Sequence, residues 1–297
     1  MINYLLLIFA VTTGATKAIL NRKVKSATPT LFTSFRLNLI CFIFGFITVF
    51  FIGIGDISSL FSVPWWLAVG TAVCTVGMQL CMMKAVQTGP ISLSSFFVYS
   101  GFMIPTIWGC LYYKESFHFL QGIGIGAILF AFALSLQKEH GKKFNFVWLL
   151  YALGAMVFSG LLGVFQKLFV KGYPTHSLHN FLTVTFFIVV ILMSIFTLVS
   201  YLFQKEKTPC GLGMSKISFF AYTIPLGVII GGLNLLNTYL SGVLPSVVVF
   251  PAINGGAIFL TTALSAIIFK EKPTKRQTIA LCIGIGAILL IALSQLL

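Results

Sequence analysis

The chain of 297 residues is 58% hydrophobic and only 8% charged, and its formal net charge is +14. A soluble domain carries roughly 25% charged residues, so this composition excludes soluble enzymes, nucleic-acid-binding proteins and disordered proteins. Apolar blocks close to the ~20 residues that a helix needs to cross a bilayer follow one another along the chain. The sequence therefore predicts an all-α polytopic membrane protein.

Ten transmembrane spans are predicted in chain order, separated by short polar gaps. Their ranges are 3–21, 30–53, 64–86, 91–113, 117–137, 146–170, 178–203, 217–239, 246–269 and 277–296. The gaps leave no room for a soluble domain. No GxxxxGK[ST] motif occurs either, so we expect no ATP-driven step within this chain.

The two halves of the sequence resemble each other. The segment Ile123–Leu129 reads IGIGAIL and recurs as Ile283–Leu289. Each half holds five spans, which predicts two repeat units at residues 1–140 and 141–297. Because five is odd, the second unit enters the membrane in the opposite orientation. Inverted repeats are typical of secondary carriers, which hold their substrate near the midplane between the two units. We therefore expect a central cavity.

The charges of the loops predict the orientation in the membrane. Of the 19 Lys and Arg residues, 14 lie in loops after spans 1, 3, 5, 7 and 9, and three are counted with loops after even-numbered spans. On the positive-inside rule the loops after odd-numbered spans face the cytoplasm and both termini face outward. The expected location is a bacterial plasma membrane.

No carboxylate lies at membrane depth in the predicted spans. The five acidic residues, in loops or at span ends, are Asp56, Glu115, Glu139, Glu206 and Glu271. This pattern opposes an intramembrane aspartyl protease and a buried acid that carries protons or pairs with a cationic drug. The motifs HExxH and GxSxG are absent and the cysteines form no cluster with histidine. We expect no catalytic residue, metal site or cofactor, and no enzyme.

Two cations lie inside predicted spans and are candidates for substrate binding. Lys17 is near the end of span 1, where snorkelling of the side chain to the interface is the alternative explanation. Arg36 is flanked by apolar residues, and an unpaired arginine in lipid costs at least ~2.5 kcal/mol. That cost favours a role for Arg36 inside the bundle, against helix-end carbonyls or a substrate anion.

Further candidate binding residues are amides and one tyrosine on polar stripes of the spans. They are Gln79, Tyr99, Gln166, Asn234, Asn237 and Asn254. Hydrogen bonding between helices is the alternative role for such side chains in membranes. Pro105 and Pro251 are predicted to kink their spans and form hinge points, with an irregular break soon after Pro251, at residues 254–256.

Ten spans, a five-span duplication and a Lys-Glu pair at the end of spans 4 and 9 resemble the EamA type of the drug/metabolite transporter superfamily. The stretch Lys84–Ser94 is similar to part of that family's repeat, and Arg36 matches an arginine common in it. The resemblance implies a basket of helices whose central cavity is walled by spans 1, 3, 4, 6, 8 and 9. It implies that Glu115 and Glu271 are structural or gate residues at helix ends. It also implies cytoplasmic termini, against the loop charges.

The sequence thus predicts a secondary transporter of a small polar metabolite, anionic, zwitterionic or neutral and amino-acid-like, that works by alternating access. Lys17 and Arg36 would attract a carboxylate or phosphate, and the amides would orient the polar body. A flippase of a lipid-linked amphiphile is one alternative, and a carrier of organic cations or drugs with an aromatic cage is another. The expected partners are a small-molecule substrate and the lipid bilayer, without nucleic acid, for a monomer or homodimer.

Overall fold

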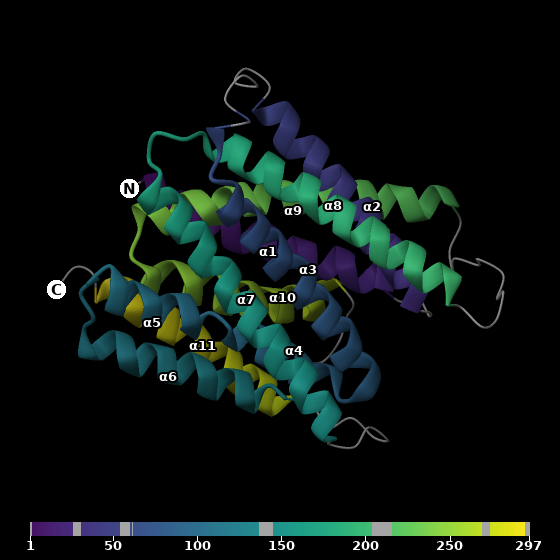
Figure 1. Ribbon diagram of the computed structural model, residues 1–297. Helices are drawn as coiled ribbons and strands as arrows, with labels where there is room; N and C mark the ends of the chain where they lie inside the picture. Colours follow the sequence, from purple (N-terminus) through teal and green to yellow (C-terminus); the bar gives the residue numbers. More distant parts are fainter. Residues whose placement is uncertain are drawn as a thin grey trace.

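The computed structural model describes residues 2–25, 31–53, 60, 62–136, 145–203, 216–268 and 274–294. Within these ranges the chain forms eleven α-helices and no strand (Figure 1). The helices are α1 (Ile2–Lys25), α2 (Leu31–Ile52), α3 (Trp65–Thr88), α4 (Ile91–Ser100), α5 (Met103–Tyr112), α6 (Phe119–Leu134), α7 (Phe146–Gly172), α8 (Leu178–Leu202), α9 (Lys216–Val243), α10 (Ser246–Ile268) and α11 (Lys275–Leu293).

Each of the ten predicted spans has a helical counterpart in the described part of the chain. Nine segments are long and apolar enough to cross a membrane, and one of them, Leu93–Tyr112, runs through both α4 and α5. The tenth span corresponds to the shorter apolar helix α6. The prediction of an all-α polytopic membrane protein is therefore confirmed.

The fourth span is broken into α4 and α5, whereas the sequence suggested a break after Pro251. Pro105 lacks an N–H group, so it cannot donate to the carbonyl of Gly101 in the usual helical pattern. That carbonyl accepts instead from Ile104 N, at 3.1 Å. By contrast, α10 is continuous through Pro251 and residues 254–256, so the break predicted there is wrong. Packing of neighbouring helices can maintain a helix across a proline in this way.

Most of the helix contacts have a counterpart when the two five-span halves are exchanged. The second span of each half packs against the other, α2 on α8, and so do the fifth spans, α6 on α11. Likewise α3 contacts α7 and α8, as α9 contacts α1 and α2. Both α4 and α5 contact α7, as α10 contacts α1. The inverted repeat, with units 1–140 and 141–297, stays a prediction that this pairing fits.

Close contact between α2 and α9 depends on three glycines. A Cβ atom on Gly231 would lie 2.7 Å from the carbonyl oxygen of Gly45, and one on Gly227 would lie 2.7 Å from that of Cys41. Small residues spaced four apart are the usual means by which membrane helices bring their backbones together. Here they fix the position of α9 against α2.

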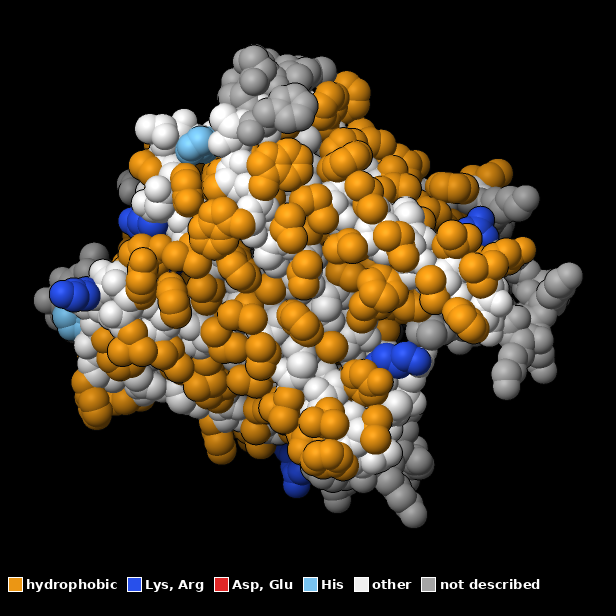
Figure 2. All heavy atoms as spheres, in the orientation of Figure 1, with side chains coloured by type: hydrophobic (Ala, Val, Ile, Leu, Met, Phe, Trp, Pro, Cys, Tyr) orange, Lys and Arg blue, Asp and Glu red, His pale blue; other side chains and the backbone are white. Residues whose placement is uncertain are grey.

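The outer surface is apolar, as a bilayer requires. Figure 2 shows hydrophobic side chains over most of one face, with Lys and Arg side chains towards its margins. The buried core has two large parts. One joins α1, α6, α9, α10 and α11 around Phe132 and Phe250, with α4 packed against it, and the other joins α2, α3, α7 and α8 around Leu67 and Phe181.

Two ends of the bundle position the candidate sites. We call the end where α5 stops and α6 begins the Glu115 end, and the end where α6 stops and α11 begins the Gln277 end. Both chain termini lie on the side of the Glu115 end (Figure 1). The loops predicted to face the cytoplasm belong to the Gln277 end.

Candidate functional site

A buried ion pair and the hydrogen bonds beside it join three spans at the Glu115 end. Lys167, in the last two turns of α7, has a side chain that is 0% exposed, and it is ion-paired with Glu115, which is 14% exposed. The Lys167 ammonium also donates to the hydroxyl of Ser246. The backbone N–H of Ser246, the first residue of α10, donates to Glu115 Oε2 at 2.8 Å. We call Glu115, Lys167 and Ser246 the Glu115 cluster.

The backbone before Glu115 is shaped to bring this carboxylate inward. Lys114 has φ +51°, a left-handed conformation that is uncommon for residues other than glycine. The turn places Glu115 N within 3.3 Å of the carbonyl of Gly109. A Cβ atom on Gly109 would lie 2.3 Å from Ser246 Oγ and 2.6 Å from Glu115 Oε2. Glycine is therefore the residue that the geometry of the cluster requires at position 109.

Aromatic side chains cover the cluster. The Tyr113 ring lies 5.5 Å from Lys167 Nζ, within reach of a cation–π interaction. Burial raises the pKa of Tyr113, with smaller contributions in the same direction from Tyr112 and Glu115. Trp108 and Tyr112 stack with their centroids 5.0 Å apart.

Lys167 corrects one inference from the sequence. It was counted with the loop after the sixth span, but it lies inside α7 and is fully buried. Its side chain is a functional candidate that sequence reasoning missed, although a lysine just inside one span and an acid just beyond another were visible signals. The corresponding acid of the second half, Glu271, lies outside the described residues.

Three of the predicted binding residues take part in hydrogen bonds between helices. Gln166 Nε2 of α7 donates to Asn234 Oδ1 of α9 at 3.1 Å. Gln79 of α3 donates to Asn38 of α2, an amide that the sequence analysis did not single out. These contacts are the ones expected of side chains that hold membrane helices together.

The two remaining amides differ in their hydrogen bonds. Asn254 donates to the carbonyl of Phe250, one turn earlier in α10, at 2.9 Å. The side-chain oxygen of Asn237 is buried and has no hydrogen-bond partner among the described residues. A buried amide without a partner is costly, so Asn237 is the amide with most to gain from a ligand or water molecule.

Lys17 and Arg36 are both half-buried, on α1 and α2. Each already has an interaction partner in the structure, so neither is an isolated charge. Pro105 lies within α5, just beyond the break in the fourth span, and Pro251 lies within continuous α10.

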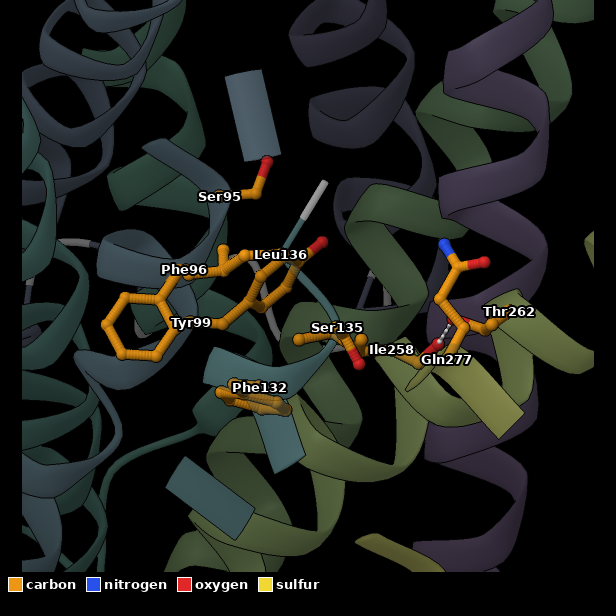
Figure 3. Close-up of a pocket in the computed structure, with 9 residues that line it drawn as sticks. All are labelled: Ser95, Phe96, Tyr99, Phe132, Ser135, Leu136, Ile258, Thr262 and Gln277. Carbon is orange, nitrogen blue, oxygen red and sulfur yellow. Dashed lines mark hydrogen bonds between the residues drawn. The ribbon is translucent and has the colours of Figure 1, made fainter. Parts of the chain in front are cut away.

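A cavity of about 170 Å³ opens between α4, α6, α10 and α11 at the Gln277 end (Figure 3). It is lined by Ser95, Phe96, Tyr99, Phe132, Ser135, Leu136, Ile258, Thr262 and Gln277. Tyr99 is the one predicted binding residue in this lining. The others were not singled out as a set, because the helices that bring them together are distant in the sequence.

The lining of the cavity is aromatic and hydroxylic and carries no formal charge. The Thr262 hydroxyl donates to the carbonyl of Ile258 at 3.0 Å. The Gln277 side chain is held at the start of α11, because its Oε1 accepts from Thr274 N at 2.9 Å. Such a lining suits the uncharged part of a small molecule. Among the described residues, no group of His, Cys, Asp and Glu could hold a metal ion.

The bundle of apolar helices and its apolar outer surface define an integral multi-pass membrane protein. Residues 146–293, from α7 to the end of α11, match the EamA-like transporter family. The fold is similar to that of a crystal structure of a protein whose sequence is 16% identical, with a TM-score of 0.77. That match covers 98% of this chain and 96% of the other. No curated protein matches.

The chain belongs to the EamA type of the drug/metabolite transporter superfamily. It is therefore a membrane transporter of that type.

Proposed function

We propose that this protein is a secondary transporter that carries a small polar metabolite by alternating access, without ATP. The observation that supports the proposal is the difference between the two ends of the bundle. The Glu115 end is joined by a buried ion pair, and the Gln277 end holds a cavity. Closure at one end and an opening at the other is what one state of an alternating-access carrier would have.

Two spans contribute residues to both the Glu115 cluster and the cavity, and we propose that these spans move. In α10, Ser246 belongs to the Glu115 cluster, whereas Ile258 and Thr262 line the cavity. In the fourth span, Glu115 follows α5 and Tyr99 lies on α4. The break between α4 and α5 supplies a hinge, so that tilting α5 with α10 would open the Glu115 end as the cavity closes.

The charge of Lys167 favours an anionic or zwitterionic substrate in this proposal. Opening the Glu115 end would separate Lys167 from Glu115. Leaving a buried charge without its partner costs about 3–5 kcal/mol, so the closed arrangement is favoured until another anion is supplied. A carboxylate or phosphate of the substrate would offset this cost.

We assign the predicted residues to roles on the same basis. Tyr99, Asn237 and Asn254 would contact the polar body of the substrate, and Lys17 and Arg36 would attract its anionic group. Gln79, Gln166 and Asn234 would mainly hold helices together. The Gln277 end would face the cytoplasm on the positive-inside rule, which makes this arrangement open to the cytoplasm.

Flux into proteoliposomes tests the proposal. Purified protein is reconstituted into liposomes that contain an unlabelled metabolite. Uptake of the same compound, labelled and added outside, is then followed without ATP. We expect saturable uptake for at least one amino acid, organic anion or sugar, accelerated by the same compound inside. Flux confined to a fluorescent phospholipid would favour the flippase alternative, and flux confined to quaternary amines would favour the cation carrier. Absence of flux of any panel member in folded protein would refute transport of a small metabolite.

A further inference from the structure

We propose that the cavity at the Gln277 end binds a single uncharged aromatic ring, and that the substrate is an organic anion or zwitterion that carries this ring. The inference rests on the proposed function and names the substrate class. It depends on the size of the cavity, on its aromatic wall, and on the charges in the turn of α11 that carries Gln277.

The size of the cavity suits one aromatic ring. Its volume is about 170 Å³. An apolar cavity of about 150 Å³ is large enough to hold benzene. One six-membered ring with a small substituent therefore fits the space.

The wall of the cavity is a fixed set of aromatic side chains. Phe132 is 3% exposed and lies edge-to-face with Phe96, with centroids 6.4 Å apart and planes at 81°. Phe102 and Phe259 contact the same Phe132 ring, at centroid distances of 6.5 and 5.5 Å. Aromatic rings gain most from offset or edge-to-face partners. A wall already held in place offers such contacts to an incoming ring without ordering new side chains.

The polar groups of the lining can form hydrogen bonds with the edge of an aromatic ring, but they cannot neutralise a charged group. Ser95, Tyr99 and Ser135 contribute hydroxyl groups, and Gln277 contributes an amide (Figure 3). None of the lining residues is Lys, Arg, His, Asp or Glu. A hydroxyl or ring nitrogen on the ligand can form hydrogen bonds here, but a buried charged group would have no counter-ion.

The first turn of α11, which carries Gln277, also carries two cations that favour an anionic group on the ligand. Lys275 and Arg276 directly precede Gln277 in the first turn of α11, and both are exposed. Their positive charges attract a carboxylate and repel an ammonium group, which disfavours a cationic ligand. The ring would therefore point into the cavity and the anionic group towards α11.

Matched pairs of compounds test the contribution of the ring. Binding to the purified full-length protein is measured by calorimetry for benzoate against acetate and for L-phenylalanine against L-alanine. We expect the compound with the ring to bind roughly tenfold or more tightly in at least one pair, as burial of one apolar ring implies. Equal affinities within both pairs would overturn the inference, as would preferential binding of benzyltrimethylammonium.

A variant that fills the cavity tests whether the ring binds there. Ser135→Leu places a larger apolar side chain in the lining, and Ser194→Leu makes the same change on the exposed face of α8 as a control. We expect Ser135→Leu to abolish the advantage of the ring, and Ser194→Leu to retain it. Melting curves of both variants verify folding, and Ser95→Leu fills the cavity from α4 if Ser135→Leu does not fold. An unchanged ring advantage in a folded, filled variant would refute the site.

The outcome separates this inference from the proposed function. If metabolites without a ring are transported and the ring does not tighten binding, the assignment of the cavity to an aromatic ring fails. The proposed transport function is then still supported. If ring compounds bind at the cavity but no panel member is carried across the membrane, the binding site stands and transport of these metabolites fails.

Discussion

Lys167 and Glu115 form a buried ion pair between α7 and the loop after α5, and the backbone N–H of Ser246 completes it at the start of α10. A single carboxylate thus contacts an ammonium group and the first turn of a long helix. The contacts between these spans at the Glu115 end therefore depend on the charge of Glu115, which leads to the first prediction.

Removing one partner of this pair should destabilise the protein more than removing both. Glu115→Gln leaves the Lys167 ammonium buried without its counter-ion, and we expect a loss of about 3–5 kcal/mol. Adding Lys167→Met removes the buried charge and should restore part of that loss. Thermal unfolding of the two single variants and the double variant gives the coupling energy. Additive losses would contradict a direct pairing.

Gly109→Ala should disrupt the same cluster by crowding. The added methyl group would lie 2.3 Å from Ser246 Oγ, so α5 and α10 must separate. Forced overpacking costs typically about 1–3 kcal/mol. Gly126→Ala on α6 is the matched control, because nothing lies within 4 Å of its new Cβ atom. Melting temperatures should fall for the first variant alone. Equal changes for both would show that helix propensity, and not contact, sets the effect.

The Gln166–Asn234 hydrogen bond should contribute to stability more than to binding. In a cycle of Gln166→Leu, Asn234→Leu and the double variant, we expect a coupling of about 0.6 kcal/mol, as measured on average for such bonds in membranes. Substrate affinity should change little in Gln166→Leu once folding is verified. A large loss of affinity without loss of stability would place Gln166 in the binding site.

Asn237→Leu should weaken substrate binding without lowering stability. Its side-chain oxygen has no hydrogen-bond partner among the described residues, so the isosteric apolar side chain removes an uncompensated polar group. We expect unchanged or increased melting temperature, together with weaker substrate binding in a calorimetric titration. A variant that melts earlier and binds normally would show that Asn237 is structural.

The sequence predicted the spans well because a bilayer imposes one strong requirement, an apolar stretch long enough to cross it. Even the 16-residue α6 was found, because Ile, Leu, Phe and Ala make up most of it. Kinks were predicted at both Pro105 and Pro251, and the irregular break was expected after Pro251, but the structure has its break just before Pro105 instead. Contacts from neighbouring helices decide which of them interrupts its helix.

The site was harder to predict because it depends on which spans lie side by side. Lys167 looked like a loop cation, since a lysine near a span end ordinarily extends to the interface. Its partner is 52 residues away in the sequence. Gln277 has the features of a capping residue, and it is one, but the same side chain also lines the cavity. No local pattern distinguishes the two roles.

The unbroken course of α10 has a consequence for inhibition. From Ser246 to Ile258 the helix spans about 18 Å, and it contacts the ion pair at one point and the cavity wall at the other. Under the proposed mechanism, a compound that lodges in the cavity and resists displacement would keep the distant Lys167–Glu115 pair intact. Such a blocker would act from the cytoplasmic side alone, without competing for contacts at the far surface of the membrane.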